Sequence, residues 1–229
     1  MPRAESRFSV RAVRATTSDG RPRSADKSER ILRAAIRVFA RKGFYAARVS
    51  DIARAAGVAD GTIYLYFRNK EHVLVRIFED RLGKLLDVLR ARLVALPTVE
   101  ERVRAVVVTQ LGLLEDQRDL AEVVTVNMRQ SSRLLRRYAA PLFQRYLDLV
   151  AAVFAEGQQA GCIRSDLSPR VAARALWGAL DGLALTWALA DGDPARLRRA
   201  ADQLAELVLR GALTPAPQQP VLDTPRRGA

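Results

Sequence analysis

Residues 48–72, RVSDIARAAGVADGTIYLYFRNKEH, decide how the rest of the chain is interpreted. They fit a short helix, a tight turn at Gly57 and a second short helix, before a longer helix begins. Small apolar side chains recur at positions that would pack the two short helices together: Ile52, Ala53, Ala56, Val58 and Ile63. The second helix is too small to hold a core, and its Gly, Thr and Tyr residues suit close approach to phosphates and base edges. The stretch therefore predicts a helix-turn-helix module that binds DNA.

One face of the second short helix would meet the DNA. Its exposed positions are predicted to be Ala59, Asp60, Gly61, Thr62, Leu65 and Tyr66. Gly61 would let the backbone approach closely, and Thr62 can bond to a phosphate or a base. Further phosphate donors are expected at Tyr64, Tyr66 and Lys70. Asp60 has two interpretations: it stabilises the helix start through the helix dipole, or it accepts a hydrogen bond from cytosine N4.

The charge of the chain is concentrated near its N-terminus. The 229 residues include 38 Lys and Arg against 25 Asp and Glu, a net charge of +13. Residues 1–70 hold sixteen of the basic and six of the acidic residues, so +10 of the charge lies there and +3 in the rest. This distribution predicts a polyanionic partner at one end of the protein, the alternative being a solvated surface produced by arginine-rich codon bias.

Several classes of protein are excluded by composition. The lone Cys162 rules out an internal disulfide framework, and the lone His72 leaves no cluster of metal ligands. The most apolar stretch, Ala175–Ala190, is interrupted by Asp181 and is too short to span a bilayer. The N-terminal arm lacks the apolar stretch of a secretory signal. We expect a cytoplasmic protein with no membrane partner, no metal and no cofactor.

The chain divides into four predicted segments, of which the two in the middle fold. A flexible basic arm is expected over 1–26, a helix-turn-helix domain over 27–72, a larger helical domain over 73–213 and a disordered Pro-rich tail over 214–229. No alternating strand pattern persists, so the fold class is all-α. Outside the module described above, helices are predicted at Lys27–Lys42, Lys70–Leu96, Val99–Asp116, Asp119–Gln130, Arg133–Ala160, Pro169–Ala190 and Pro194–Leu213.

The N-terminal region resembles a known family. The sequence KSERILRAAIRVFARKGF, followed by VSDIARAAGVADGTIYLYFRNKEHVL, is similar to the N-terminal domain of the TetR family of bacterial transcription regulators. The resemblance implies an all-helical homodimer whose two heads bind a palindromic operator in double-stranded DNA. It also implies a larger C-terminal domain for dimerisation and for binding a small ligand, and the protein releases the DNA when the ligand binds. By position, the phosphate contacts would come from Thr62, Tyr64, Tyr66 and Lys70, and the base contacts from Asp60, Gly61 and Leu65.

Two positions depart from the pattern of that family. Arg48 stands where many members have Thr, so the expected capping box with Asp51 is missing, although Arg48 can contact phosphate directly. Ala59 stands where Ser is common, so the second short helix also loses a cap. With Ser50, these positions complete the predicted DNA-binding set.

The C-terminal domain contains a basic amphipathic segment. Arg129–Tyr146 holds five arginines and no acid, interleaved with apolar residues. Such a helix can place guanidinium groups at the rim of an apolar pocket, which suits an amphipathic anion; the alternative is an ordinary core helix with a basic outer face. The predicted ligand-binding residues are Met128, Arg129, Gln130, Arg133, Arg137, Tyr138, Phe143, Trp177, Leu180 and Trp187. For Trp177 and Trp187 the alternative to lining a pocket is a core or interface position, where such residues are more often found.

A narrower resemblance extends over residues 27–212. The segments VADGTIYLYFRNKEHVL, VTVNMRQSSRLLRRY and 146–193 resemble the FadR-type branch of the TetR family. That resemblance implies a repressor of fatty-acid degradation genes that is released from its operator by long-chain acyl-CoA. The alternative is a repressor of efflux genes that responds to another hydrophobic ligand. In the family the last two helices form the dimer seam, which would involve Gly178, Gly182, Leu185, Leu204 and Leu207.

Two other functional classes were considered. One His and one Cys cannot form a Ser/His/acid or Cys/His set, and no Gly-rich phosphate loop is present. No catalytic residues are therefore predicted, and the protein is not expected to be an enzyme. An architectural DNA-binding protein would coat DNA without sequence preference, whereas a regulator would protect a short palindrome.

Overall fold

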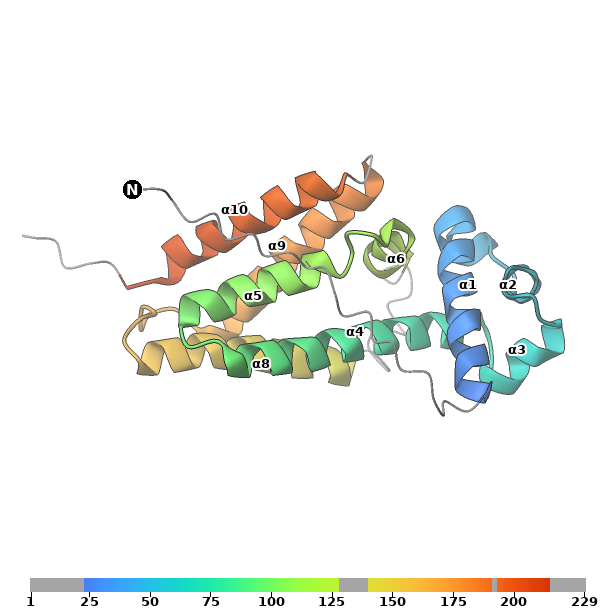
Figure 1. Cartoon of the computed structure of the whole chain (residues 1–229), viewed down its shortest axis with the longest axis horizontal. Helices are drawn as coiled ribbons and strands as arrows, with labels where there is room; N and C mark the ends of the chain where they lie inside the picture. Colours follow the sequence, from blue (N-terminus) through green and yellow to red (C-terminus); the bar gives the residue numbers. More distant parts are fainter. Residues whose placement is uncertain (1–22, 128–139, 191–192, 215–229) are drawn as a thin grey trace, which may run out of the picture.

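The computed structural model describes residues 23–127, 140–190 and 193–214 (Figure 1). The helices run in the order α1 (Arg23–Ala46), α2 (Val49–Ala56), α3 (Asp60–Tyr66), α4 (Lys70–Ala95), α5 (Val99–Gly112), α6 (Arg118–Glu122), the π-helix η1 (Val123–Asn127), α8 (Ala140–Gln159), α9 (Pro169–Leu189) and α10 (Pro194–Ala212). In these residues all regular secondary structure is helical, apart from an isolated bridge between Ile163 and Leu213. The predicted all-α class is confirmed.

The molecule has two parts joined by α4. We call α1–α3 with the first turns of α4 the head, and the rest of α4 with α5–α10 the body (Figure 1). Val73, Leu74 and Ile77 of α4 are buried in the head core, whereas Leu82 and Leu89 of the same helix are buried in the body core. One continuous helix therefore contributes side chains to both cores.

The head core forms where the apolar rows of α1 meet α2–α4. Ile31, Ala35 and Phe39 are completely buried, as the helical spacing of the sequence predicts. The α-helical backbone of α1 is interrupted at Gly43, which takes φ 71° and ψ 160°, a conformation that a residue with a Cβ seldom adopts. The sequence predicted that the first helix ends at Gly43. The helix is interrupted there, as expected, but it resumes for one more short turn to Ala46.

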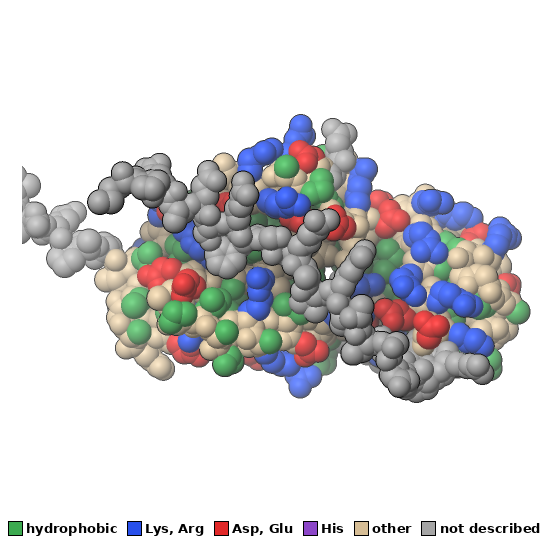
Figure 2. Space-filling model, in the orientation of Figure 1, with side chains coloured by type: hydrophobic (Ala, Val, Ile, Leu, Met, Phe, Trp, Pro, Cys, Tyr) green, Lys and Arg blue, Asp and Glu red, His purple; other side chains and the backbone are tan. Residues whose placement is uncertain are grey.

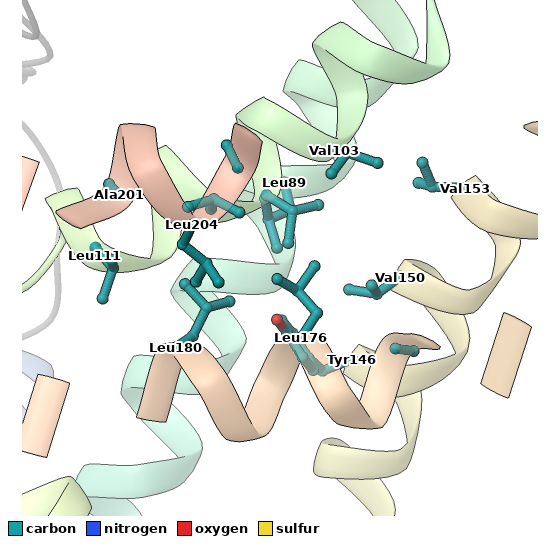
Figure 3. Close-up of a cluster of buried hydrophobic side chains, with 14 of the residues drawn as sticks. Leu89, Val103, Leu111, Tyr146, Val150, Val153, Leu176, Leu180, Ala201 and Leu204 are labelled. Atoms are coloured by element: carbon teal, nitrogen blue, oxygen red, sulfur yellow. The ribbon is translucent and has the colours of Figure 1, made fainter. Parts of the chain in front are cut away.

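The body core is built from α4, α5, α8, α9 and α10. Figure 3 shows Leu89, Val103, Tyr146 and Leu176 converging on it from different helices. The head and body cores also meet away from α4, because Leu120 of α6 and Val123 of η1 are buried in the head core. Helix α6 and η1 therefore pack against α1 while belonging in sequence to the body.

The helix boundaries follow local signals in most places. Asn69 caps α4 by accepting a hydrogen bond from the His72 N–H at 2.8 Å, and Thr98 caps α5 in the same way. Helix α9 begins at Pro169 as predicted, although no bond from the Ser168 hydroxyl caps it. Three predicted boundaries are wrong. Helix α1 begins at Arg23, inside the predicted arm, and not at Lys27. Helix α5 ends at Gly112 and not at Asp116, and the helix predicted from Asp119 becomes a π-helix at Val123.

Candidate functional site

The helix-turn-helix of the head has the geometry that the sequence predicts. Gly57 closes α2 in the left-handed conformation, with φ 63° and ψ 44°. The Val58 N–H then donates to the Ala53 carbonyl at 3.0 Å, which satisfies one of the last carbonyls of α2. Ile52 of α2 and Ile63 of α3 are completely buried between the helices. The opposite face of α3 is consequently turned away from the protein.

The outer face of α3 is exposed. Leu65 is 82% exposed and Tyr64 57% exposed. Ala59, Asp60 and Gly61 are exposed as well. A Cβ added to Gly61 would meet no atom of the described protein within 4 Å, so the packing of the protein does not require glycine there. An external partner that approaches the backbone closely would require it.

The remaining predicted DNA residues of α3 and α2 are less exposed. Thr62, Tyr66 and Ser50 are half-buried, and the Tyr66 ring packs against the head core. Thr62 and Tyr66 stay predicted phosphate contacts, and Ser50 stays in the predicted DNA-binding set.

One of the two hydrogen bonds of a capping box is present at the start of α2, although the sequence predicted that the box is missing. The Asp51 carboxylate accepts a hydrogen bond from the Arg48 backbone N–H at 3.0 Å, as the acid of a capping box does. The Arg48 side chain is exposed and cannot accept the reciprocal bond. Asp51 also pairs with Lys42 at 2.8 Å. Hydrogen bonds from Lys42 and from the Arg48 N–H hold the pKa of Asp51 below its ordinary value.

Lys70 does not have the role expected from the sequence. Its Nζ donates to three backbone carbonyls at the end of α1, those of Phe44 at 2.9 Å, Tyr45 at 2.9 Å and Ala47 at 3.1 Å. The ammonium also lies 4.8 Å from the centroid of the Phe44 ring. Because an ammonium has three protons, these bonds use all of them. Lys70 fastens α4 to the C-terminus of α1, and its prediction as a phosphate contact is wrong for this conformation.

Basic side chains cover the outer surface of the head. The arginines along the outer face of α1 are all exposed: Arg30, Arg33, Arg37 and Arg41. Figure 2 shows Lys and Arg side chains gathered across the end of the molecule where Figure 1 places α1–α3. One of them, Arg37, donates to the Ala55 carbonyl at 3.3 Å and so also ties α1 to α2. The electropositive surface lies on the same part of the molecule as the exposed face of α3.

The body contains an apolar pocket next to the head. Its cavity volume is about 140 Å³, and it opens to solvent. The apolar lining comes from α4, from the loop after α5, from α6 and η1, and from α9: Phe78, Leu82, Leu85, Leu113, Leu114, Leu120, Val124, Trp177 and Ala184. The polar and charged lining residues are Arg81, Lys84, Gln110, Gln117, Thr125 and Asp181.

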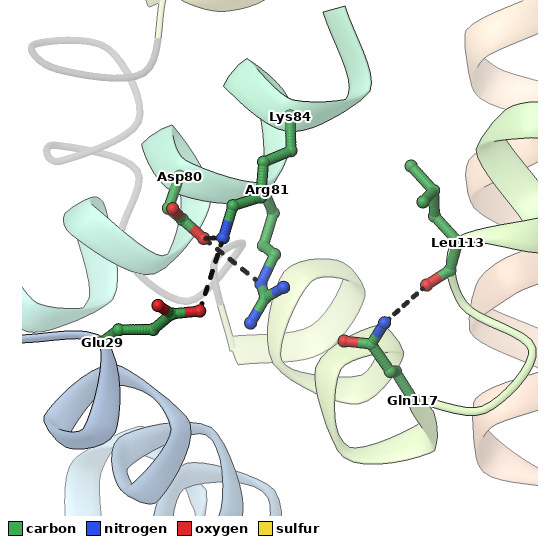
Figure 4. A network of polar contacts seen from close by, with 6 residues as sticks. All are labelled: Glu29, Asp80, Arg81, Lys84, Leu113 and Gln117. Atoms are coloured by element: carbon green, nitrogen blue, oxygen red, sulfur yellow. Dashed lines mark hydrogen bonds and ion pairs between the residues drawn. The ribbon is translucent and has the colours of Figure 1, made fainter. Parts of the chain in front are cut away.

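Two cations of the pocket wall are held by acids at the junction of head and body. Lys84 pairs with Asp80 at 2.9 Å and lies 3.9 Å from Glu29 of α1, and Arg81 lies 3.5 Å from Asp80 (Figure 4). On the other side, Gln117 donates to the Leu113 carbonyl at 3.1 Å. These pairs are partly exposed, so they are weak individually and open to competition from an anion.

Only four of the ten predicted ligand-binding residues lie in the part of the chain that the structure describes. The other six lie outside the described residues: Met128, Arg129, Gln130, Arg133, Arg137 and Tyr138. Trp177 lines the pocket, and Phe143 packs edge-on against it with ring centroids 4.7 Å apart. Leu180 and Trp187 are not among the lining residues of this pocket. Both are buried in the body core, where the Trp187 indole donates to the Asp193 carbonyl at 2.9 Å, and they stay predictions.

The sequence interpretation missed Arg81, Lys84 and Gln110. Phe78, Leu82 and Leu85 form an apolar row with helical spacing beside the two cations. That row was an available signal for α4, but it does not say which helices complete the pocket. Gln110 carries no local signal.

The predicted dimer residues also separate into two groups. Gly178 is exposed and Gly182 half-buried, and a Cβ on either would meet no atom of the described protein within 4 Å. Leu185 is half-buried, and Leu207 is 70% exposed on α10. These four residues are accessible and stay predicted interface residues. Leu204 was wrongly predicted, because it is buried in the body core with 8% of its surface exposed.

Metal-binding clusters and membrane-spanning helices are both absent from the described residues. No group of three or more His, Cys, Asp or Glu that could hold a metal ion occurs there. None of the helices described is long and apolar enough to cross a membrane.

Comparison with known proteins assigns both parts of the chain. Residues 31–77 match the model for bacterial regulatory proteins of the tetR family, and residues 78–211 match the model for the C-terminal region of YsiA-like proteins. The fatty acid metabolism regulator protein of Bacillus subtilis is 34% identical over 165 residues, which cover 72% of this chain and 85% of that protein.

Two solved structures share the fold over most of their length. One is the fatty acid degradation regulator FadR from Bacillus halodurans, with a TM-score of 0.77, 34% identity and coverage of 84% of this chain and 98% of that one. The other is FadR from Bacillus subtilis in complex with stearoyl-CoA, with a TM-score of 0.74, 33% identity and coverage of 80% and 98%. With the helix-turn-helix geometry of the head, these matches establish that the chain belongs to the tetR family of bacterial regulatory proteins.

Proposed function

We propose that this protein is a homodimeric repressor of genes of fatty-acid metabolism that leaves its operator when it binds a long-chain acyl-CoA. In this proposal residues 27–72 bind DNA, and residues 73–213 bind the effector and dimerise. The protein acts in the cytoplasm by binding alone and does not turn over the acyl-CoA. The relatives named above support this choice, since one is a fatty acid metabolism regulator and another was solved with stearoyl-CoA.

The observation that carries the proposal is the shared wall between the pocket and the head. Leu120 lines the pocket and is also buried in the head core, and Phe78 packs against both cores. A ligand that fills the pocket must therefore contact residues that position α1 and α4. Packed protein interiors have low compressibility. A side chain that is packed in both cores can therefore transmit a movement of one core to the other.

The chemistry of the pocket suits an amphipathic anion. The lining is mostly apolar, as an acyl chain requires, and Arg81 and Lys84 provide positive charge. Arg81 and Lys84 are paired with Asp80 and Glu29, and these ion pairs are partly exposed. The phosphates of the CoA moiety could therefore replace the two carboxylates as partners of the cations. A cationic drug would gain nothing from them.

The magnitude of the required effect is modest. An effector releases DNA only through its preference for the form that binds DNA poorly. A hundredfold loss of operator affinity requires that acyl-CoA bind that form about a hundredfold more tightly, which corresponds to about 2.7 kcal/mol.

Operator binding with and without effector tests the proposal. Genomic fragments bound by the protein are selected and footprinted, and binding is measured again with palmitoyl-CoA or oleoyl-CoA. We expect a short palindromic footprint and a loss of affinity of about a hundredfold with acyl-CoA, but not with CoA plus free palmitate. Coating without sequence preference, release by a cationic drug in place of acyl-CoA, or hydrolysis of the thioester would each contradict the proposal.

The DNA face has its own test. Leu65→Ala should weaken operator binding about tenfold, because an exposed apolar side chain facing the bases loses contact worth roughly 1–3 kcal/mol. Palmitoyl-CoA binding should be unchanged. Val94→Ala is the matched control, since Val94 is 87% exposed on α4 and far along the chain from α3. Equal operator affinity of both variants would show that α3 does not face the bases.

A further inference from the structure

One polar side chain of the pocket wall is held in a fixed orientation by a buried partner. Tyr146 of α8 is completely buried, and its hydroxyl donates to Oε1 of Gln110 on α5 at 2.5 Å. Gln110 in turn lines the pocket. Tyr146 is itself positioned by aromatic neighbours, because the Trp177 ring packs edge-on against it with centroids 5.0 Å apart.

The direction of this hydrogen bond follows from the chemistry of the phenol. A phenol has one proton, and a buried phenol that accepted the amide N–H would leave its own proton unpaired. Burial also raises the pKa of Tyr146 well above its ordinary value, so the proton stays in place. The oxygen of the Gln110 amide is therefore committed to Tyr146. Among the described residues, the amide nitrogen has no acceptor.

The pocket thus carries an amide donor in a mostly apolar wall. The described residues contain no buried side-chain nitrogen without a partner, so this amide nitrogen is open to solvent. A ligand that displaces water here must supply an acceptor in its place, or it loses affinity. The tail of a fatty acyl group has no acceptor atom, and the amides of pantetheine lie nearer the charged end of the molecule. The thioester carbonyl is the acceptor that joins the two parts.

We infer that the Gln110 amide donates a hydrogen bond to the thioester carbonyl oxygen of the acyl-CoA effector, with Tyr146 as the positioning residue. This inference rests on the proposed function. It assigns Gln110 a role in specificity: the residue distinguishes an acyl thioester from a ligand of equal length and charge that lacks the carbonyl.

A comparison of two ligands tests the assignment. Palmitoyl-CoA and its thioether analogue S-hexadecyl-CoA have the same chain length and the same CoA moiety, and differ in the carbonyl group. The dissociation constants of the full-length protein for both are measured by calorimetry. We expect palmitoyl-CoA to bind about tenfold more tightly, because the thioether leaves the donor unpaired.

Substitutions then locate the source of that preference. Gln110→Leu should reduce the ratio of the two constants to about one, whereas Gln144→Leu, at an exposed amide of α8 outside the pocket, should keep it. Gln110→Glu preserves an acceptor for the Tyr146 hydroxyl, so it removes the donor without leaving the phenol unpaired. Tyr146→Phe should lower the ratio partway. Since both ligands are measured on the same variant, a general loss of stability does not change the ratio.

The outcomes separate the inference from the proposed function. If the unmodified protein binds both ligands equally, or if the preference survives in Gln110→Leu and Gln110→Glu, the inference is overturned while acyl-CoA remains the effector. If the unmodified protein binds neither ligand, both the inference and the proposed function are overturned.

Discussion

The functional residues of the head are close together in the sequence, whereas those of the body are widely spread. The exposed face of α3 comes from seven consecutive residues, Asp60–Tyr66, whose orientation is set by the turn at Gly57. The pocket combines residues from Phe78 to Ala184, which no local geometry brings together. The comparison shows that a DNA-binding surface can be located from a short motif, whereas an effector pocket exists only after the helices of the body have packed.

The two regions are nevertheless not independent. Leu120 and Val123 follow the body's first helices in sequence, yet they complete the head core. Lys70 fastens the start of α4 to the end of α1 from within the head. The distinction between head and body is therefore a distinction of function and not of folding, and three variants test it.

The largest effect is expected from Leu120→Ala. The side chain is 4% exposed, and its truncation should lower the free energy of unfolding by about 3 kcal/mol, from lost burial and a residual cavity. Hydrogen exchange of α1 amides should speed up together with that of α9 amides, because one side chain supports both parts. Val94→Ala, at an exposed position of α4, should change stability by less than about 0.5 kcal/mol. Protection of α1 unchanged from the unmodified protein would mean that the head folds by itself.

A smaller effect is expected from Lys70→Met. Three carbonyls at the end of α1 would lose their donor, and the free energy of unfolding should fall by about 2 kcal/mol. The slope of operator affinity against salt should stay unchanged, since a lost phosphate contact would lower it by roughly 0.9. Arg68→Met, at an exposed neighbouring residue, serves as the stability control. A flatter slope combined with full stability would restore Lys70 to the DNA contacts.

The smallest effect concerns the pH dependence of Asp51. Its folded-state pKa is lowered by Lys42 and the Arg48 N–H, so its contribution to stability is present above the ordinary value of 3.8 and is lost as the pH falls through the lowered value. Asp51→Asn should therefore lower Tm at pH 7, and the difference from the unmodified protein should shrink toward pH 3. Asp87→Asn, at an exposed acid of α4, should show no such trend. A difference that grows on acidification would reverse the assignment.

Most of the fold could be predicted because its boundaries carry local signals. The cap at Asn69 and the stop at Pro97 bracket α4 to within one residue of the predicted end. The end of α5 at Gly112 has no such signal. Leu114, just beyond it, packs against both cores, so tertiary contacts and not propensity turn the chain there. The π-helix is likewise held by tertiary contacts, because Val123 at its start is buried in the head core.

The functional residues also divide into those with a local sequence signal and those whose role depends on tertiary contacts. The exposed face of α3 was predictable from Gly57 and the apolar residues that pack beneath it. The role of Lys70 was not, because its ammonium bonds to carbonyls 23 to 26 residues earlier in the chain. Leu204 and Leu207 are both apolar residues of α10, and only the packing of the body decides which of them faces inward.

The continuity of α4 has a geometric consequence. A helix of 26 residues is about 39 Å long at 1.5 Å per residue. Because α4 is packed in the body core from Leu82 onward, only the part from Lys70 to Leu82, about 18 Å long, extends beyond that core. A tilt of this part by about 10° displaces the first turn by about 3 Å, which is close to the rise of one base-pair step in DNA, about 3.4 Å. In the proposed homodimer, a small angular change of α4 would be enough to put the two recognition helices out of register with the grooves of the operator.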